Sequence, residues 1–262
     1  MAVIRIPLAL LLTVLAAPSL SHGRTLQQVL NEGEIRIGVV LMIPWAIRTT
    51  PDELTGFEID VANQLALDLG VEADIRVYPQ ERIITALETG EIDLIAAGLA
   101  ITPERALHVN FSNPYSTTGI SMATNQDTTI LVNELEDFDD PDFILATVTG
   151  SEATDLVSRV FPRAESREFE TVETASEALI EGEVDAFLEE EPIPSFLALD
   201  NPSTVDAPLS GPLVQRRAGF GVAKGDPDFL AFLNAWITSR QADTWLPTIH
   251  SFWFSSLRWR DP

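Results

Sequence analysis

The first half of the chain alternates between segments with the pattern of buried strands and segments with the pattern of amphipathic helices. The expected strands are residues 34–41, 73–77 and 92–97, and the expected helices are residues 56–70 and 82–88. In the first of these helices, Phe57, Val61 and Leu65 recur every four residues and Gly70 ends the pattern, which is typical of a helix closed by glycine. This alternation predicts an α/β fold in which helices cover a mostly parallel sheet.

A short pattern occurs twice and favours two similar units in one chain. Residues 86–95 read ALETGEIDLI, and residues 178–187 read ALIEGEVDAF. Each copy combines the end of a helix, a glycine stop, a polar corner and a buried strand. Because such corners are common in α/β proteins, the match favours two α/β lobes without excluding chance.

The composition excludes several kinds of function. The 262 residues include 16 Lys or Arg and 40 Asp or Glu, which gives a net charge of −24. The phosphates of nucleic acids and of anionic membranes would repel such a chain, so we expect no nucleic-acid partner. The absence of cysteine excludes disulfides, thiolate metal sites and a lipidated cysteine. With only three histidines in addition, we expect neither a metal nor a cofactor.

The N-terminus has the pattern of an export signal. Arg5 precedes an apolar run, residues 6–20, which ends among small residues, and these are the parts of a secretory signal peptide. The run is too short for a membrane-spanning helix, which needs about 20 apolar residues. We expect a signal peptide at residues 1–21, cleavage near Ser21, and a periplasmic, freely soluble protein without a lipid anchor.

The segment that reads GLAITPER, residues 98–105, is the most informative for chemistry. Thr102 before Pro103 is typical of a helix N-cap followed by proline, and a helix N-terminus attracts anions. Arg105 lies in the first turn, where its positive charge opposes the helix dipole. A guanidinium at that position could clamp a carboxylate, or it could pair with a nearby acid on the surface. The residues alone do not decide between these two interpretations.

Familiar enzyme motifs are absent, although carboxylates are plentiful. The sequence contains no HExxH, P-loop or GxSxG motif. Glu190 ends an expected buried strand, and α/β proteins bind ligands at the carboxyl ends of their strands. A solvated strand end is the alternative. The acidic run at 133–143 lacks the glycine of a calcium loop and is interpreted as a solvated connection.

In several stretches the sequence resembles the family 3 extracytoplasmic solute-binding proteins, the receptors of polar amino-acid ABC importers. The similar stretches include LTGFEIDVA at 54–62, residues 86–95, ITPER at 101–105, VNFSNPY at 109–115, residues 184–192 and KGDP at 224–227. The resemblance implies a type II periplasmic-binding-protein clamshell whose two lobes are joined by two crossing hinge strands, near 117–124 and 217–223. Lobe 1 would comprise residues 22–118 and 219–262, and lobe 2 residues 119–218.

The resemblance also implies ligand-binding roles for residues of the first lobe. Arg105 would grip the α-carboxylate of the ligand, Thr102 would assist it, and Gly98 would contribute backbone. Trp45 would stack on the ligand. Ala100 stands where many relatives have a hydroxyl residue, so one hydrogen bond to the carboxylate is lost, worth about 1.5–3 kcal/mol.

Three residues of the second lobe complete the implied site. Ser151 and Glu152 occupy the turn that closes around the carboxylate, although the charge of Glu152 would repel it unless the side chain turns away or is protonated. Glu190 stands where an aspartate usually binds the α-ammonium. In the related cyclohexadienyl dehydratases a catalytic Glu follows that acid by three residues, whereas here Ile193 does, which argues against an enzyme.

The resemblance thus implies a monomeric periplasmic receptor that binds a small amino-acid-like ligand and delivers it to an ABC permease in the inner membrane. Three alternatives stay open: a cationic or zwitterionic solute that is not an amino acid, a receptor that reports to a membrane sensor, and a dehydratase-like enzyme.

Overall fold

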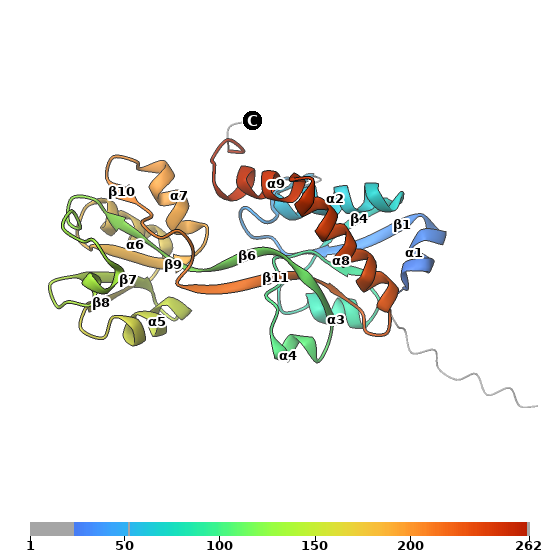
Figure 1. Cartoon of the computed structure of the whole chain (residues 1–262), viewed down its shortest axis with the longest axis horizontal. Helices are drawn as coiled ribbons and strands as arrows, with labels where there is room; N and C mark the ends of the chain where they lie inside the picture. Colours follow the sequence, from blue (N-terminus) through green and yellow to red (C-terminus); the bar gives the residue numbers. More distant parts are fainter. Residues whose placement is uncertain (1–23, 52, 261–262) are drawn as a thin grey trace, which may run out of the picture.

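One continuous sheet runs through both halves of the molecule, with helices on either side of it (Figure 1). The computed structural model describes residues 24–51 and 53–260. Within these ranges the sheet has nine strands in the order β4-β1-β5-β11-β6-β9-β7-β8, and β10 pairs with β6. The strands are distributed over two lobes, and β6 and β11 join these lobes (Figure 1). This arrangement confirms the predicted fold class, a two-lobed α/β clamshell with two connecting strands.

Lobe 1 is formed by both ends of the described chain. Its strand β1 pairs in parallel with β4 and with β5, and its core is rich in aromatic residues. The elements of lobe 1 are α1 (Leu26–Glu32), β1 (Glu34–Val39), β2 (Ile47–Thr50), β3 (Glu53–Thr55), α2 (Phe57–Leu69), β4 (Glu72–Val77), α3 (Ile83–Glu88), β5 (Leu94–Ile95), α4 (Pro103–Ala106), α8 (Pro227–Ala242) and α9 (Trp245–Phe254).

The two C-terminal helices pack on lobe 1, as the aromatic-rich end of the sequence suggests. Trp236 in α8 and Trp253 in α9 are buried. Their indole N–H groups donate hydrogen bonds to Asp68 and Asp60 of α2, both at 2.7 Å. Burial of aromatic surface with a satisfied polar tip explains why this end of the chain closes lobe 1.

A buried carboxylate ties the start of the described chain to the centre of lobe 1. The side chain of Asp93, just before β5, is fully buried and accepts hydrogen bonds from Arg24 at 2.5 Å and Arg36 at 2.6 Å. Burial alone would raise the pKa of Asp93, but the bonds from the two guanidinium groups hold it below its ordinary value. The aspartate therefore stays ionised and paired.

Lobe 2 repeats the same strand and helix order. Strand β7 pairs in parallel with β8 and β9, and its core is separate from that of lobe 1. The elements of lobe 2 are a 3-10 helix η1 (Leu135–Phe138), β7 (Ile144–Val148), α5 (Glu152–Val160), β8 (Glu165–Phe169), α6 (Val172–Ile180), β9 (Ala186–Glu190), α7 (Ile193–Asp200) and β10 (Val205–Asp206).

The hinge strands β6 (Asn110–Asn125) and β11 (Val214–Val222) are antiparallel to each other. In their register Arg216 lies opposite Thr118, and Glu190 of β9 lies opposite Ile120 of β6. Gly119 has φ +147°, and a Cβ atom there would come within 1.8 Å of the Val214 carbonyl oxygen. The two strands approach too closely at this point for any side chain. The predicted lobe boundaries at 118/119 and 218/219 remain a prediction.

The arrangement of the strands differs from the sequence predictions in two respects. The sheet is parallel within each lobe but mixed as a whole, because the hinge strands pair antiparallel in its middle. The strand expected at 92–97 is reduced to β5, since the chain turns away soon afterwards at Gly98, which has φ +60°.

The predicted signal peptide lies outside the described residues. Among the helices of residues 24–51 and 53–260, none combines the length and apolarity that a membrane span requires.

Candidate functional site

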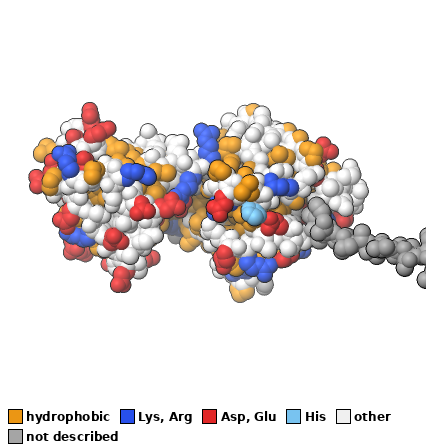
Figure 2. All heavy atoms as spheres, turned by 90° about the horizontal axis from the view of Figure 1, so that it is seen from below, with side chains coloured by type: hydrophobic (Ala, Val, Ile, Leu, Met, Phe, Trp, Pro, Cys, Tyr) orange, Lys and Arg blue, Asp and Glu red, His pale blue; other side chains and the backbone are white. Residues whose placement is uncertain are grey.

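A cavity of about 340 Å³ lies between the lobes beside the hinge strands. Figure 2 shows a hollow there, with acidic and basic side chains where the lobes face each other. Its lining consists of Val40, Met42, Gln80, Ile83, Ala97, Gly98, Leu99, Ala100, Thr102, Glu104, Arg105, Thr118, Glu152, Glu190 and Arg216. Six of the eight predicted site residues are thus brought together, and the exceptions are Trp45 and Ser151.

The lobe 1 wall presents a guanidinium on a single helical turn. The Thr102 hydroxyl accepts a hydrogen bond from the Arg105 N–H at 3.2 Å and caps α4 as predicted. The Arg105 guanidinium donates to the Ala100 carbonyl at 3.0 Å. Within residues 24–51 and 53–260 it forms no ion pair, so its charge is available to a ligand. Because α4 has only four residues, the positive charge on this wall is that of the Arg105 side chain and not that of a helix dipole.

Trp45 does not reach the cavity, contrary to the prediction. Only 2% of it is exposed, and its ring packs edge-on against Phe57 at 5.7 Å and Phe254 at 4.7 Å. A Cβ atom on Gly98 would come within 3.0 Å of the Trp45 ring. Trp45 therefore supports the Gly98 turn from behind, and the apolar contacts on the cavity side of this loop come from Val40 and Met42.

The lobe 2 wall carries three charged side chains that contact one another: Glu190 at the end of β9, Arg216 in β11 and Glu152 at the start of α5. Glu190 accepts hydrogen bonds from Thr118 at 3.4 Å and Arg216 at 3.3 Å, and Arg216 also forms an ion pair with Glu152. Burial and then the charge of Glu189 raise the pKa of Glu190 above its ordinary value. Because Arg216 compensates Glu152, the repulsion of a carboxylate anticipated from the sequence is reduced.

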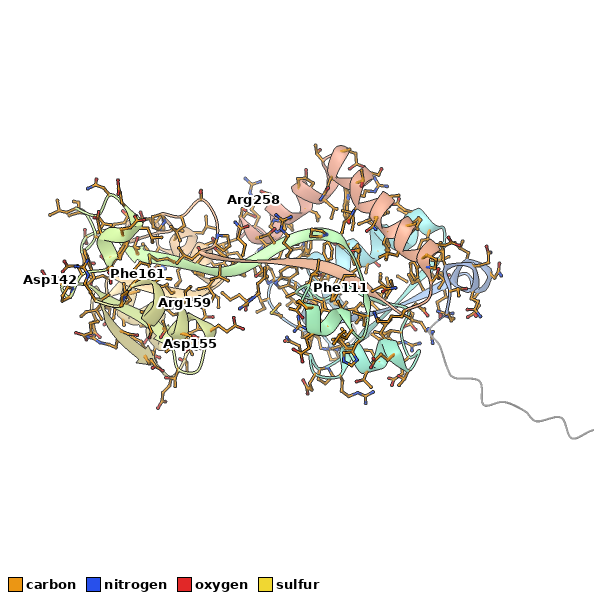
Figure 3. All side chains as sticks on the ribbon, turned by 60° about the horizontal axis from the view of Figure 1, so that its bottom comes forward. Phe111, Asp142, Asp155, Arg159, Phe161 and Arg258 are labelled. Carbon is orange, nitrogen blue, oxygen red and sulfur yellow. The ribbon has the colours of Figure 1, made fainter. Side chains whose placement is uncertain are left out.

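Ser151 stands at the N-terminus of α5 but outside the cavity lining. It is the N-cap residue, yet its hydroxyl makes no capping hydrogen bond. Its oxygen is buried and has no partner among the described residues. Figure 3 shows Asp155 and Arg159 further along the same helix.

Behind the lobe 1 wall lies a buried carboxyl group that the sequence analysis did not single out. Glu58 is fully buried, and one of its oxygens accepts hydrogen bonds from the Gly98 N–H and the Tyr115 hydroxyl, both at 2.6 Å. Its other oxygen has no partner in the described part of the chain. Burial raises the pKa of Glu58 to about 7 despite these two bonds. Glu58 thereby fixes the backbone of a cavity residue from behind.

Arg216 and Thr118 are two further polar residues of the cavity lining that the sequence analysis did not assign to the site. Both belong to the predicted hinge segments or lie beside them. The only available signal was the pair of arginines at 216 and 217, which stands next to an expected crossing strand. Which of the two faces the cavity depends on the pairing of β11 with β6.

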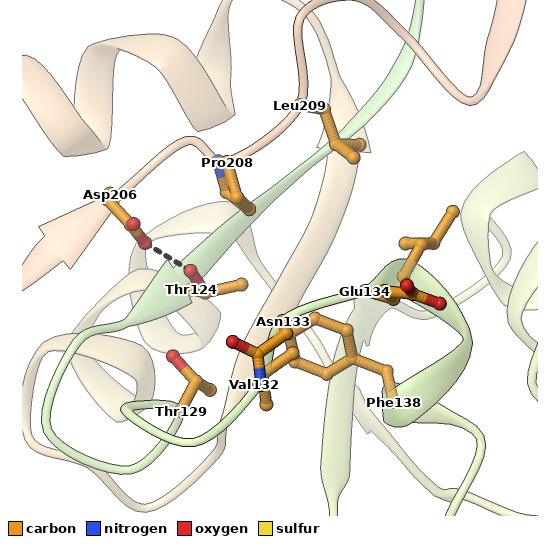
Figure 4. A pocket seen from close by; sticks show the side chains of 10 residues that line it. Thr124, Thr129, Val132, Asn133, Glu134, Phe138, Asp206, Pro208 and Leu209 are labelled. Carbon is orange, nitrogen blue, oxygen red and sulfur yellow. Dashed lines mark hydrogen bonds between the residues drawn. The ribbon is translucent and has the colours of Figure 1, made fainter.

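A second pocket, of about 160 Å³, lies entirely in lobe 2 (Figure 4). The Thr124 hydroxyl and Asp206 form a hydrogen bond in it. Because both walls belong to one lobe, a ligand there would not link the two lobes. Within the described ranges, no group of three or more His, Asp or Glu side chains is placed to hold a metal ion.

The molecule has two α/β lobes joined by two hinge strands, and charged side chains from both lobes line the cavity between them. These features define a periplasmic-binding-protein-like receptor. Residues 35–256 match the model of the bacterial extracellular solute-binding proteins, family 3. The chain belongs to this family.

The similar proteins are named for different solutes, and one of them is named as an enzyme. The glutamate-binding protein GluB of Corynebacterium efficiens is 30% identical over 88% of this chain and 82% of that protein. An ancestral cationic amino acid solute-binding protein superposes with a TM-score of 0.75 at 29% identity, covering 87% of this chain and 99% of that one. An ancestral cyclohexadienyl dehydratase superposes with a TM-score of 0.67 at 25% identity, covering 89% of this chain and 98% of that one.

Proposed function

We propose that this protein is an exported, monomeric receptor that captures an amino acid between its lobes and delivers it to an ABC permease in the inner membrane. Its membership of the solute-binding family supports this role, and so do the amino-acid solutes named for its relatives. On this proposal the signal peptide is removed near Ser21.

One observation carries the proposal: the cavity presents an unpaired guanidinium on one wall and an excess carboxylate on the other. Arg105 forms no ion pair within the described residues, whereas Glu152 and Glu190 share Arg216. A zwitterion that places its carboxylate at Arg105 and its ammonium at Glu190 neutralises both walls. An α-amino acid is the simplest such ligand.

Binding and lobe closure are coupled in this arrangement. The two walls belong to lobes whose cores are separate, and only a ligand that contacts both walls gains from bringing them together. The ligand therefore shifts the population towards the closed form by its additional contacts there. A permease can distinguish loaded from empty receptor by this difference in shape.

The test is isothermal titration calorimetry with the twenty standard amino acids, on the wild-type protein and on Arg105→Gln. We expect at least one amino acid to bind the wild type, and Arg105→Gln to weaken that binding by about 2 kcal/mol or more, roughly 30-fold. Arg159→Gln removes an exposed arginine from α5 and should leave affinity unchanged. Unaltered affinity in Arg105→Gln would refute the assignment of the carboxylate site.

We further propose that the protein is not a dehydratase, although it resembles one in structure. Ile193, at the first position of α7, has no group that can transfer a proton. Incubation with prephenate or arogenate should leave the substrate unchanged. Its consumption at a rate proportional to protein concentration would favour the enzyme.

A further inference from the structure

The lobe 2 wall contains one more charged pair than a zwitterionic ligand requires. Arg216 lies between two carboxylates: it forms an ion pair with Glu152, and its Nη1 atom is 3.3 Å from Glu190 Oε1. The Arg216 side chain is 25% exposed, against 74% for Glu152 and 45% for Glu190. The least exposed member of the cluster is therefore the cation, and each of its two neighbours is partly satisfied by it.

The charges of the cavity balance only for one class of amino acid. Arg105 and Glu190 match the two charges of the ligand backbone, which leaves Arg216 and Glu152 to neutralise each other. Glu104, the remaining charged residue of the lining, is exposed, where water and salt screen its charge. No free charge is left over for the side chain of the ligand.

We propose that the Arg216–Glu152 pair sets the ligand class, so that the receptor selects α-amino acids whose side chains are uncharged. The inference rests on the proposed function and deepens it. A ligand with a second carboxylate must separate Arg216 from Glu152, and a ligand with a second ammonium must separate Glu152 from Arg216. Neither ligand gains a net ion pair, because the charge that it engages is taken from an existing pair, and its own second charge still loses hydration in the cavity.

The apolar part of the lining acts in the same direction. Val40, Met42, Ile83 and Leu99 contribute apolar surface to the cavity, and Met42 is 42% exposed. Contact between this apolar surface and an uncharged ligand side chain makes binding more favourable, whereas the surface offers no hydrogen bond to a charged side chain. Thus both the paired charges and the apolar lining favour the same ligand class.

The test compares L-glutamine, L-glutamate and L-lysine by calorimetry on the wild type and on two variants that each free one charge. The wild type should prefer glutamine at least tenfold over the other two. Glu152→Gln leaves Arg216 with a spare charge and should improve glutamate binding at least tenfold. Arg216→Gln leaves Glu152 unpaired and should improve lysine binding by a similar factor. Thermal unfolding of each variant establishes that it is folded.

Matched controls separate the pair from the general charge of lobe 2. Asp155→Asn and Arg159→Gln remove one negative and one positive charge from α5, the helix that carries Glu152, at the positions shown in Figure 3. Both should retain the wild-type order of affinities. Glu152→Gln tests the inference on its own if Arg216→Gln does not fold, because it frees the charge of Arg216 without changing Arg216 itself.

Each outcome bears on a different claim. A folded wild type that binds none of the standard amino acids overturns the proposed function itself. A wild type that prefers glutamate or lysine to glutamine, or variants without any change in preference, overturns the inference about the pair and leaves the receptor function standing. A shift produced equally by the control variants also overturns it, because the general charge of lobe 2 would then be the cause.

Discussion

Glu58 makes the stability of lobe 1 depend on pH, and its replacement by glutamine should remove that dependence. Burial raises the pKa of Glu58 from 4.5 to about 7. Between these pH values the folded protein holds a proton that the unfolded chain has already released. The free energy of unfolding therefore falls as pH rises through this window. At about 1.36 kcal/mol per pKa unit, the loss by pH 8 is about 3 kcal/mol.

Glutamine keeps the shape of the protonated acid. Its oxygen can accept the hydrogen bonds from Gly98 and Tyr115 that Glu58 accepts at 2.6 Å. Its amide nitrogen replaces an oxygen that has no partner within the described residues, at a cost of about 1 kcal/mol. Glu58→Gln should thus be slightly less stable than the wild type at pH 5 and about 2 kcal/mol more stable at pH 8.

Urea denaturation followed by tryptophan fluorescence at pH 5, 6, 7 and 8 measures the free energy of unfolding of both proteins and shows where the variant becomes the more stable one. His250 also contributes to the profile, since burial lowers its pKa, so protonation below pH 6.5 favours the unfolded chain. The difference between wild type and variant cancels that contribution. Two stability profiles that stay parallel over the whole range would refute the assignment of a raised pKa to Glu58.

Two further substitutions test the framework that holds the site. Asp93→Asn leaves the two guanidinium groups that contact it without their buried carboxylate and should lower the free energy of unfolding by about 3–5 kcal/mol; a loss below about 1 kcal/mol would contradict the ion-pair account. Gly119→Ala places a Cβ atom 1.8 Å from the Val214 carbonyl oxygen in the hinge and should cost about 2 kcal/mol or more in urea denaturation. If Gly119→Ala were as stable as the wild type, the hinge strands would be able to move apart at no cost in free energy.

Local patterns were sufficient to predict several strands and helices of lobe 1. The helix expected at 56–70 is α2, Phe57–Leu69, and the strand expected at 34–41 is β1, Glu34–Val39. Both are set by the spacing of apolar residues and by glycines at their ends, which act within a few residues. The Thr102 cap of α4 was predicted for the same reason.

The details of the site depend on contacts between distant segments, which a single sequence does not reveal. Trp45 was expected to face a ligand, but its ring is held in the core by Phe254, which arrives from the opposite end of the chain. Arg216 was missed because its neighbours, Glu152 and Glu190, come from different elements of lobe 2. Spacing along the sequence carries no information about these contacts.

The most direct test of the account is a distance measured across the cleft with and without an amino acid. The sequence has no cysteine, so Leu107→Cys next to α4, at a residue 77% exposed, and Asp155→Cys in α5 can be spin-labelled selectively. The distance between the labels should shorten with the tightest-binding amino acid of the panel, and should not shorten at the same concentration when Arg105→Gln is added. An unchanged distance in a protein shown by calorimetry to be saturated would contradict capture between the lobes.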